Sequence, residues 1–345
     1  MSATVARVIE FIDGEVLGSV ASREAAGDYP HDLAARMREL GLFGLPISRE
    51  YGGSAAPIDE CARVLEEVGR GWASLADLLS THFTAARLIQ EVGSEEQRRR
   101  YLPAMAAGDS IGGIALTERA VGSDLRAVEL TARREGDGYV LEGEKFLITH
   151  VDHADPMVVF ARVVGEDSRA EGYRFFLVAQ EDEGVRTQGD LTKLGHKNVE
   201  FGGFALDAVR LGVDRALEGR DGDGFAHLLS VINFGRLWVA SGSLGIARRA
   251  LEVAVEQTAS REAFGSPLAE NPAVVDRLGE MSVRTESARA LVERLGRALA
   301  DPSLLPRRAV GSLAATAKIV ASRAAVENGA KSLELHGGLG FTTER

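Results

Sequence analysis

The sequence is poor in cysteine, in long apolar runs and in positive charge. Cys61 is the only cysteine in 345 residues, which excludes an intramolecular disulfide and is typical of a reducing compartment. No run reaches the ~18 consecutive apolar residues of a membrane span, and the first residues lack a signal-peptide core. Because 51 acidic residues stand against 40 basic ones, giving a net charge of −11, we expect neither nucleic acid nor a membrane as partner. We therefore expect a cytoplasmic protein.

Familiar catalytic motifs are also missing. There is no GxGxxG after a strand, no Walker loop, no HExxH and no nucleophile elbow. Cys61 lies in the helical pattern IDECARVLEEVG, which favours a buried structural cysteine over a nucleophile. His150 and His153 are the only close histidine pair, and no cysteine or carboxylate pattern surrounds them, so no metal site is predicted.

The sequence pattern changes twice along the chain and divides it into three regions. Residues 1–110 have helical periodicity, and VGSEEQ begins with a capping box in which Ser94 and Gln97 exchange hydrogen bonds with the backbone. Residues 111–215 alternate like strands, with a hairpin turn predicted at Asp137-Gly138. Residues 216–345 contain three long helical patterns with small residues such as Gly242 and Gly245, typical of close helix packing. We predict an α+β protein with a helical domain, a middle β domain of barrel or sandwich type and a C-terminal four-helix bundle, bounded as above.

The junction LTERAVGSDLRA, at the start of the β region, is the first candidate site. Thr117, Gly122 and Ser123 place hydroxyl groups and a bare backbone at a domain boundary, where ligand clefts preferentially form. A turn capped by Ser or Asp is the competing interpretation.

Composition alone favours the turn, but four motifs, of which the junction is the first, shift the balance toward a ligand site. LTERAVGSD, GDGYVLEGEKFLIT, SREAFGSPL and LHGGLGFTTE, in this order, together with EYGG near residue 50, resemble the acyl-CoA dehydrogenase family across nearly the whole chain. The resemblance implies an FAD-dependent oxidoreductase that acts on the CH–CH bond of an acyl thioester, carried on CoA or on an acyl carrier protein. It also implies a homodimer or homotetramer, and an electron-transfer flavoprotein or another acceptor as redox partner.

The resemblance also assigns residues. Thr117 would hydrogen-bond the flavin ring, Ser123 would lie near the pyrophosphate and the thioester arm, and Thr149 would reach the reactive flavin edge. Arg261 would pair with the FAD phosphate of a neighbouring subunit; its competing role is a cation at a helix C-terminus. The predicted cofactor-binding set is Leu116, Thr117, Gly122, Ser123, Leu147, Thr149, Arg261, Phe264, Gly337 and Gly338, and the predicted substrate-binding set is Ser123, Asn233 and Arg236.

The sequence departs from the family pattern at the catalytic base. In most members a glutamate base lies some two dozen residues past the Gly-Gly loop, a position beyond Arg345. A minority carry it on the long helix directly before an arginine, where this chain has Gly235 before Arg236. The catalytic residue is therefore unknown. Arg236 would help form the acyl-CoA pocket, with a structural ion pair as the competing role.

Other departures lie on the cofactor side. Leu147 stands where a tryptophan is usual, and Pro272 and Glu334 replace glutamines. Three functions stay open on this evidence: an acyl-thioester dehydrogenase, a flavin-dependent monooxygenase on the same fold, and a non-catalytic binding or assembly subunit that lacks the base.

Overall fold

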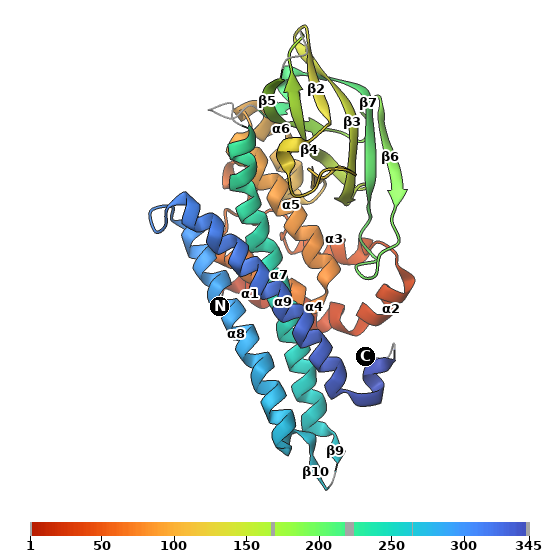
Figure 1. Cartoon of the computed structure of the whole chain (residues 1–345), viewed down its shortest axis with the longest axis vertical. Coiled ribbons are helices and arrows are strands. Elements are labelled where there is room, and N and C mark those ends of the chain that lie inside the picture. The colour runs from red at the N-terminus through yellow and green to blue at the C-terminus, as the bar shows by residue number, and fades with distance from the viewer. Residues whose placement is uncertain (1, 167–169, 218–223, 264, 343–345) are drawn as a thin grey trace. The chain divides into compact units, whose positions relative to one another are not determined.

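The chain runs from helices to strands and back to helices, as predicted (Figure 1). The computed structural model describes residues 2–166, 170–217, 224–263 and 265–342. The α-helices are α1 Ala3–Phe11, α2 Val20–Ala26, α3 His31–Glu39, α4 Ile58–Gly71, α5 Ala73–Val92, α6 Glu95–Ala107, α7 Gly224–Ser260, α8 Pro272–Ala300 and α9 Arg307–Leu335. The strands are β1 Ile111–Ala115, β2 Thr131–Glu135, β3 Gly138–Thr149, β4 Ala154–Val164, β5 Ala170–Val178, β6 Val185–Asp190, β7 Phe201–Gly212, β8 Ala216–Leu217, β9 Glu262–Ala263 and β10 Ser266–Pro267.

Two units gather these elements. Unit 1 comprises Met1–Leu33, Pro57–Ser80 and Asn233–Arg345, and unit 2 comprises Ala34–Ala56 and Thr81–Ile232. The boundary falls inside α3, α5 and α7, so each of these helices has residues in both units. The three-domain boundaries read from the sequence stay a prediction.

Unit 2 is built on one sheet with the order β6-β7-β3-β2-β4-β5-β8, to which β1 adds by parallel pairing with β4. The β2–β3 hairpin exists, but its turn lies one residue earlier than predicted, at Gly136 and Asp137, with Glu135 opposite Gly138. Gly136 adopts a φ of +59°, a conformation that glycine supplies at no steric cost. The turn lies at Gly136-Asp137 rather than at Asp137-Gly138 because its first residue must adopt a positive φ, which Gly136 accepts.

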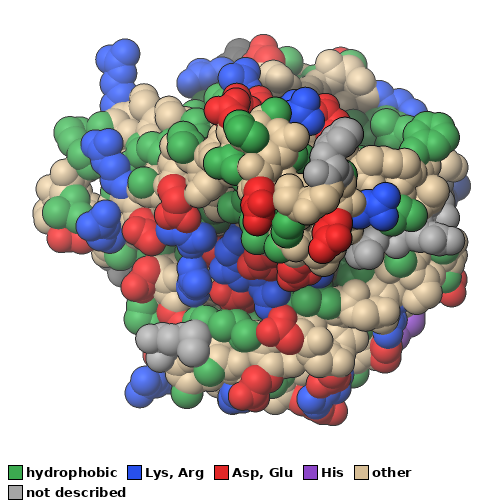
Figure 2. All heavy atoms as spheres, turned by 90° about the horizontal axis from the view of Figure 1, so that it is seen from below, with side chains coloured by type: hydrophobic (Ala, Val, Ile, Leu, Met, Phe, Trp, Pro, Cys, Tyr) green, Lys and Arg blue, Asp and Glu red, His purple; other side chains and the backbone are tan. Residues whose placement is uncertain are grey.

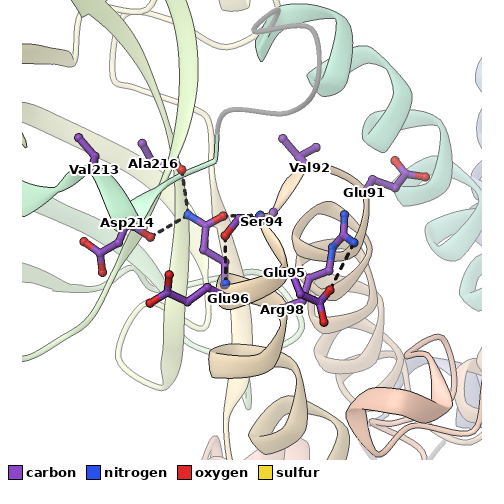
Figure 3. A pocket seen from close by; sticks show the side chains of 11 residues that line it. Glu91, Val92, Ser94, Glu95, Glu96, Arg98, Val213, Asp214 and Ala216 are labelled. Carbon is purple, nitrogen blue, oxygen red and sulfur yellow. Dashed lines mark hydrogen bonds and ion pairs between the residues drawn. The ribbon is translucent and has the colours of Figure 1, made fainter.

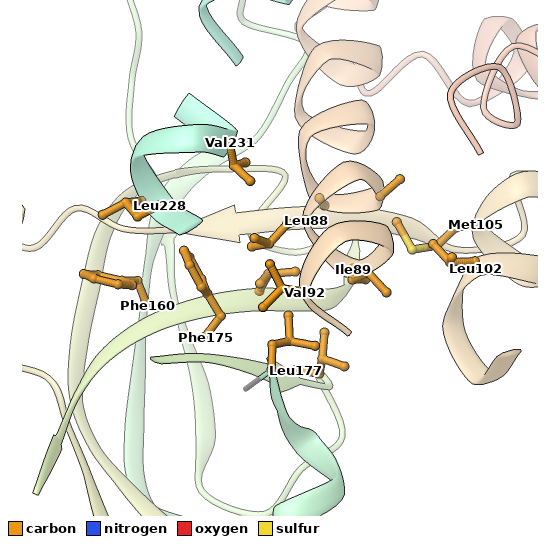
Figure 4. Packing of buried hydrophobic residues seen from close by; sticks show 14 of the residues in the cluster. Leu88, Ile89, Val92, Leu102, Met105, Phe160, Phe175, Leu177, Leu228 and Val231 are labelled. Carbon is orange, nitrogen blue, oxygen red and sulfur yellow. The ribbon is translucent and has the colours of Figure 1, made fainter. Parts of the chain in front are cut away.

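A hydrophobic cluster joins helices to one face of this sheet within unit 2 (Figure 4). Leu88 and Val92 at the end of α5 point toward Phe160 and Phe175 of β4 and β5, whose ring centroids are 5.0 Å apart. The predicted capping box starts α6: the Gln97 N–H donates to Ser94 Oγ at 3.2 Å, and the Ser94 N–H donates to Gln97 Oε1 at 2.7 Å. The local sequence signal and the packing therefore agree here.

Unit 1 is a set of closely crossing helices, in which α8 and α9 lie side by side (Figure 1). Asn328 of α9 is fully buried and its amide nitrogen lies 3.2 Å from Ala247 O of α7 and 3.1 Å from Met281 O of α8, which ties the three long helices together. Cys61 of α4 is buried, as predicted. Within the described residues, α9 is the one helix long and apolar enough to cross a membrane by length and composition, a test that core helices also pass.

Glycines set the distance between α4 and α7. A Cβ added at Gly245 would strike the Glu66 carbonyl and lie 2.9 Å from Gly69 C, and one added at Gly69 would strike the Gly242 backbone. The obstacles are backbone atoms of the facing helix, which cannot rotate away. The predicted close packing through Gly242 and Gly245 is thus confirmed.

We expect Gly245→Ala to lower the free energy of unfolding by about 1–3 kcal/mol, because the added methyl group pushes α4 from α7. Gly279→Ala is the matched control: Gly279 lies within α8, is exposed and has open space at its Cβ position. The control should stabilise by roughly 0.5–1 kcal/mol through helix propensity alone. Urea denaturation of both variants checks this, and a stabilising Gly245→Ala would contradict the crossing geometry.

Candidate functional site

The junction predicted as a site follows β1 in unit 2. Leu116 and Thr117 are half-buried, whereas Gly122 and Ser123 are exposed. Two backbone hydrogen bonds between Glu118 and Val121, of 2.8 and 3.2 Å, close a tight turn that turns Gly122 and Ser123 outward. A Cβ at Gly122 would meet nothing within 4 Å, so open space borders the loop.

A distortion in β3 presents Leu147. The register of β3 against β7 slips between Lys145 and Ile148, and Leu147 adopts a φ of +59° with its side chain 41% exposed. A branched apolar residue at positive φ is strained, and bulges of this kind often re-aim a side chain at a functional site. Thr149, two residues further along the strand, is half-buried.

Two hydrogen bonds join the loop after β1 to β3. The Phe146 N–H donates to Thr117 O at 2.9 Å, and Lys145 Nζ donates to Leu116 O at 3.0 Å. The structure therefore unites six residues of the predicted cofactor set in unit 2, on the loop after β1 and the end of β3: Leu116, Thr117, Gly122, Ser123, Leu147 and Thr149.

The remaining predicted residues belong to unit 1. Asn233, Gly235 and Arg236 lie on α7 and are half-buried. Arg236 Nη1 contacts Asn233 Oδ1 at 3.3 Å, and within the described part of the chain Arg236 forms no ion pair, so the competing structural role has no support. The guanidinium keeps hydrogen-bonding capacity for a ligand.

Three further residues of the predicted cofactor set, Arg261, Gly337 and Gly338, are exposed. Arg261 directly follows the last residue of α7 and is exposed, a position that also satisfies its competing role as a helix C-terminal cation. Gly337 and Gly338 are exposed in a turn after α9, with a φ of +61° at Gly337 and open space at both Cβ positions. Phe264 lies outside the described residues.

Two of the departures from the family pattern have a local explanation. Pro272 is the first residue of α8, where its missing N–H costs nothing, and Asn271 caps the same helix by accepting from the Ala273 N–H at 2.9 Å. Glu334 is exposed. Its carboxylate lies 2.9 Å from Lys331 Nζ and 4.0 Å from Arg277 Nη1. The hydrogen bond and charge of Lys331 lower the pKa of Glu334. Its negative charge is therefore already compensated.

The sequence analysis did not identify His82, a buried histidine whose ring joins the segment at Phe43 to β1 by hydrogen bonds. His82 of α5 is fully buried; its Nε2 lies 3.2 Å from Phe43 O, and its Nδ1 accepts from the Gly112 N–H of β1 at 3.2 Å. These partners assign a neutral ring with the proton on Nε2. Burial lowers the pKa of His82 from 6.5 to about 4, an effect that the Phe43 hydrogen bond opposes and His150 reinforces.

This pKa predicts an acid-sensitive stability. Because the folded-state pKa of His82 is depressed, the unfolded chain binds more protons below pH 6.5, and the free energy of unfolding falls as the pH drops from about 6.5 to 4. The shift corresponds to about 3 kcal/mol at most. In His82→Gln we expect a shallower fall of stability over this window, measured by denaturation at a series of pH values. An unchanged slope would contradict the assignment.

A pocket of unit 2 lies away from the predicted site residues (Figure 3). It measures about 700 Å³ and is lined by the start of α6 and the segment before β8, with Gln97 Nε2 donating to Asp214 O at 2.7 Å and Ala216 O at 2.8 Å. Four carboxylates line it, those of Glu91, Glu95, Glu96 and Asp214, against one guanidinium, that of Arg98. This charge opposes an anionic dinucleotide, and none of the predicted site residues lines the pocket.

Charges of both signs also mix at the surface. On the face drawn in Figure 2, basic and acidic side chains lie side by side near the centre. Among the described residues, no group of three or more His, Cys, Asp or Glu side chains is placed to hold a metal ion.

Known protein families and relatives match this chain over nearly its whole length. Residues 2–109, 113–209 and 222–345 match the N-terminal, middle and C-terminal domains of acyl-CoA dehydrogenases. An acyl-CoA dehydrogenase of Bacillus subtilis is 32% identical over 97% of this chain and 86% of its own length.

Solved structures agree. Butyryl-CoA dehydrogenase from Megasphaera elsdenii superposes with a TM-score of 0.92 at 26% identity, over 100% of this chain and 91% of that one. A glutaryl-CoA dehydrogenase from Mycobacterium smegmatis in complex with FADH2 superposes with a TM-score of 0.89 at 29% identity, over 98% and 84%. With its three domains matched in order and a 32% identical relative aligned over 86% of its own length, the chain belongs to the acyl-CoA dehydrogenase family.

Proposed function

We propose that this chain holds FAD against the loop after β1 and the end of β3, and that it oxidises the bond between the α and β carbons of an acyl-CoA. FAD-dependent oxidation of a CH–CH bond is the family's chemistry, and FAD, when bound, supplies the hydride acceptor. The acyl thioester is the substrate class of the relatives named above.

One observation carries the cofactor assignment. The hydroxyl groups of Thr117, Ser123 and Thr149 have no hydrogen-bond partner within the described chain, although all three lie in the segments that Phe146 and Lys145 join. Beside them, Leu147 offers an exposed apolar side chain at a strained backbone position. Free hydroxyls and an apolar contact fit a flavin ring, which combines polar edges with apolar faces.

Residues of unit 1 complete the proposal. Arg236, with its side chain oriented by Asn233, would bind the acyl-CoA, and its delocalised charge suits a carbonyl or phosphate oxygen. Arg261 would hold the FAD phosphate of a neighbouring subunit, whose FAD Gly337 and Gly338 would also approach. Their exposure leaves them available for this contact, which supports a homodimer or homotetramer. We further propose an electron-transfer flavoprotein as redox partner and a cytoplasmic location.

The visible spectrum of the purified protein tests this function. We expect a flavin spectrum, either as purified or after FAD is added, and loss of the flavin absorbance when butyryl-CoA is added without oxygen. A colourless protein that gains no bound FAD would contradict the proposal and favour a binding or assembly subunit. A flavin that butyryl-CoA leaves oxidised, but that stays reduced after chemical reduction with dithionite until oxygen is admitted, would favour the monooxygenase.

A further inference from the structure

A buried ion pair lies directly behind the proposed flavin-contacting residues. Lys145 of β3 has no exposed side-chain surface, and Glu118, in the loop after β1, is only 7% exposed. Lys145 Nζ donates to Glu118 Oε1 at 2.8 Å and to Leu116 O at 3.0 Å. The same carboxylate accepts the Glu129 N–H at 2.7 Å and the Leu130 N–H at 3.1 Å.

Stability alone does not account for such a pair. The free energy needed to move two charges out of water offsets much of their mutual attraction. Apolar residues of similar volume often stabilise a core equally well. A buried pair with every oxygen engaged does specify one arrangement of the backbone around it. The relevant question is which arrangement this pair specifies.

The pair connects three segments that meet at the proposed site. Through Leu116 O and Glu118 it fixes the loop on both sides of Thr117, and through the amides of residues 129 and 130 it fixes the approach to β2. The Phe146 N–H then donates to Thr117 O, immediately before the bulge that presents Leu147 at a φ of +59°. Thr117 and Leu147 thus take their relative positions from one lysine and one glutamate.

The outer face of the same strand provides a comparison. Arg119 lies over the Phe146 ring at 4.0 Å and pairs with Glu144 at 3.6 Å, but both charged side chains are at least half exposed. Exposed pairs restrain the backbone weakly because water competes for both partners. Glu144 precedes Lys145 in the chain and faces outward, so it is a natural control.

We propose that Glu118 and Lys145 form a positioning pair that holds Thr117 against the Leu147 bulge and thereby fixes the surface on which the flavin ring rests. This inference rests on the proposed function. Neither residue touches the cofactor; both act through Leu116, Thr117 and the Lys145–Phe146 backbone.

The test removes both charges at once. In Glu118→Gln/Lys145→Met no buried charge is left unpaired, so the double variant should fold, and thermal unfolding of the apo-protein verifies this. Glu144→Gln is the matched control on the outer face. The first measurement is amide hydrogen exchange of the apo-protein: we expect protection of the Phe146 amide to fall at least tenfold in the double variant and to stay unchanged in the control and in the core strands β4 and β5.

The second measurement is FAD binding. We expect the dissociation constant for FAD to rise at least tenfold in the double variant and the visible circular dichroism of the bound flavin to change, with the control matching the wild type. Unchanged exchange at Phe146, or lost protection with unchanged FAD affinity and spectrum, would overturn the inference. A double variant that does not fold is replaced by Glu118→Gln/Lys145→Gln, which also leaves no buried charge unpaired, judged by the same criteria. A wild-type protein that binds no FAD would instead overturn the proposed function, a result visible before any variant is made.

Discussion

Glu67→Leu is expected to lower the free energy of unfolding by about 3–5 kcal/mol, the cost of removing one partner from a buried ion pair. Glu67 lies on α4 with only 1% of its side chain exposed. Its carboxylate accepts from Arg248 at 3.0 Å, from Arg70 at 3.1 Å, and faces Arg63 at 3.3 Å. Without it, buried guanidinium groups of α4 and α7 would face one another with less compensation.

The charge state of Glu67 supports this size of effect. Burial by itself would raise the pKa of Glu67, but the hydrogen bond and charge of Arg248, with Arg63 and Arg70, hold it below its usual value. The carboxylate is therefore ionised at neutral pH and contributes stability above its unfolded-state pKa, which is lost as the pH falls through the lower folded-state pKa. The neighbouring Glu66, which Arg248 contacts at 2.7 Å and Arg289 at 2.9 Å, extends the network to α8.

Urea denaturation at neutral pH measures the effect, with Glu327→Gln as control. Glu327 of α9 pairs with Arg284 at 2.7 Å, but it is 52% exposed, so its removal should cost less than ~1 kcal/mol. Glu67→Gln keeps the shape and removes the charge, and should fall between the two. Equal losses for Glu67→Leu and Glu327→Gln would show that the buried network does not carry the stability attributed to it.

Features with a local cause were predictable from the sequence. The capping box at Ser94 and Gln97, the β2–β3 hairpin and the long helix α7 each arise from residues close together in the chain. The residues proposed to contact the flavin were predicted from motifs, and six of them lie in unit 2 on the loop after β1 and the end of β3. The predicted turn was one residue too late, because the alternation of polar and apolar residues does not show whether Gly136 or Gly138 adopts the positive φ.

Features that arise from distant segments were not predictable. Glu67 and Arg248 are 181 residues apart, and Lys145 and Glu118 are 27 apart in different segments, so no periodicity signals either pair. His82 is one of several polar residues of α5, and nothing in the sequence shows that Phe43 O and Gly112 N bind its ring. The strained backbone of Leu147 is likewise invisible, since a leucine within a strand pattern predicts ordinary extended geometry.

The base position on α7 leads to the largest expected change in activity. Gly235→Glu should raise the rate of butyryl-CoA oxidation by the FAD-loaded 345-residue chain by about 10²–10⁴-fold, the usual contribution of a positioned general base. Position 235 lies directly before Arg236, as the base does in the minority of the family, and both residues are half-buried on α7. A carboxylate there would take the proton from the carbon next to the thioester carbonyl.

The matched control is Gly235→Gln, which has the same size and lacks a basic group. Both side chains are better helix formers than glycine, by roughly 0.5–1 kcal/mol, and thermal unfolding of both variants verifies that they fold. Initial rates with an artificial electron acceptor compare the three proteins. Because the two variants differ only between carboxylate and amide, a gain limited to Gly235→Glu shows that a carboxylate at position 235 abstracts the proton. Equal rates for the two variants would show that position 235 does not face the reacting carbon, and would remove α7 as the site of a base.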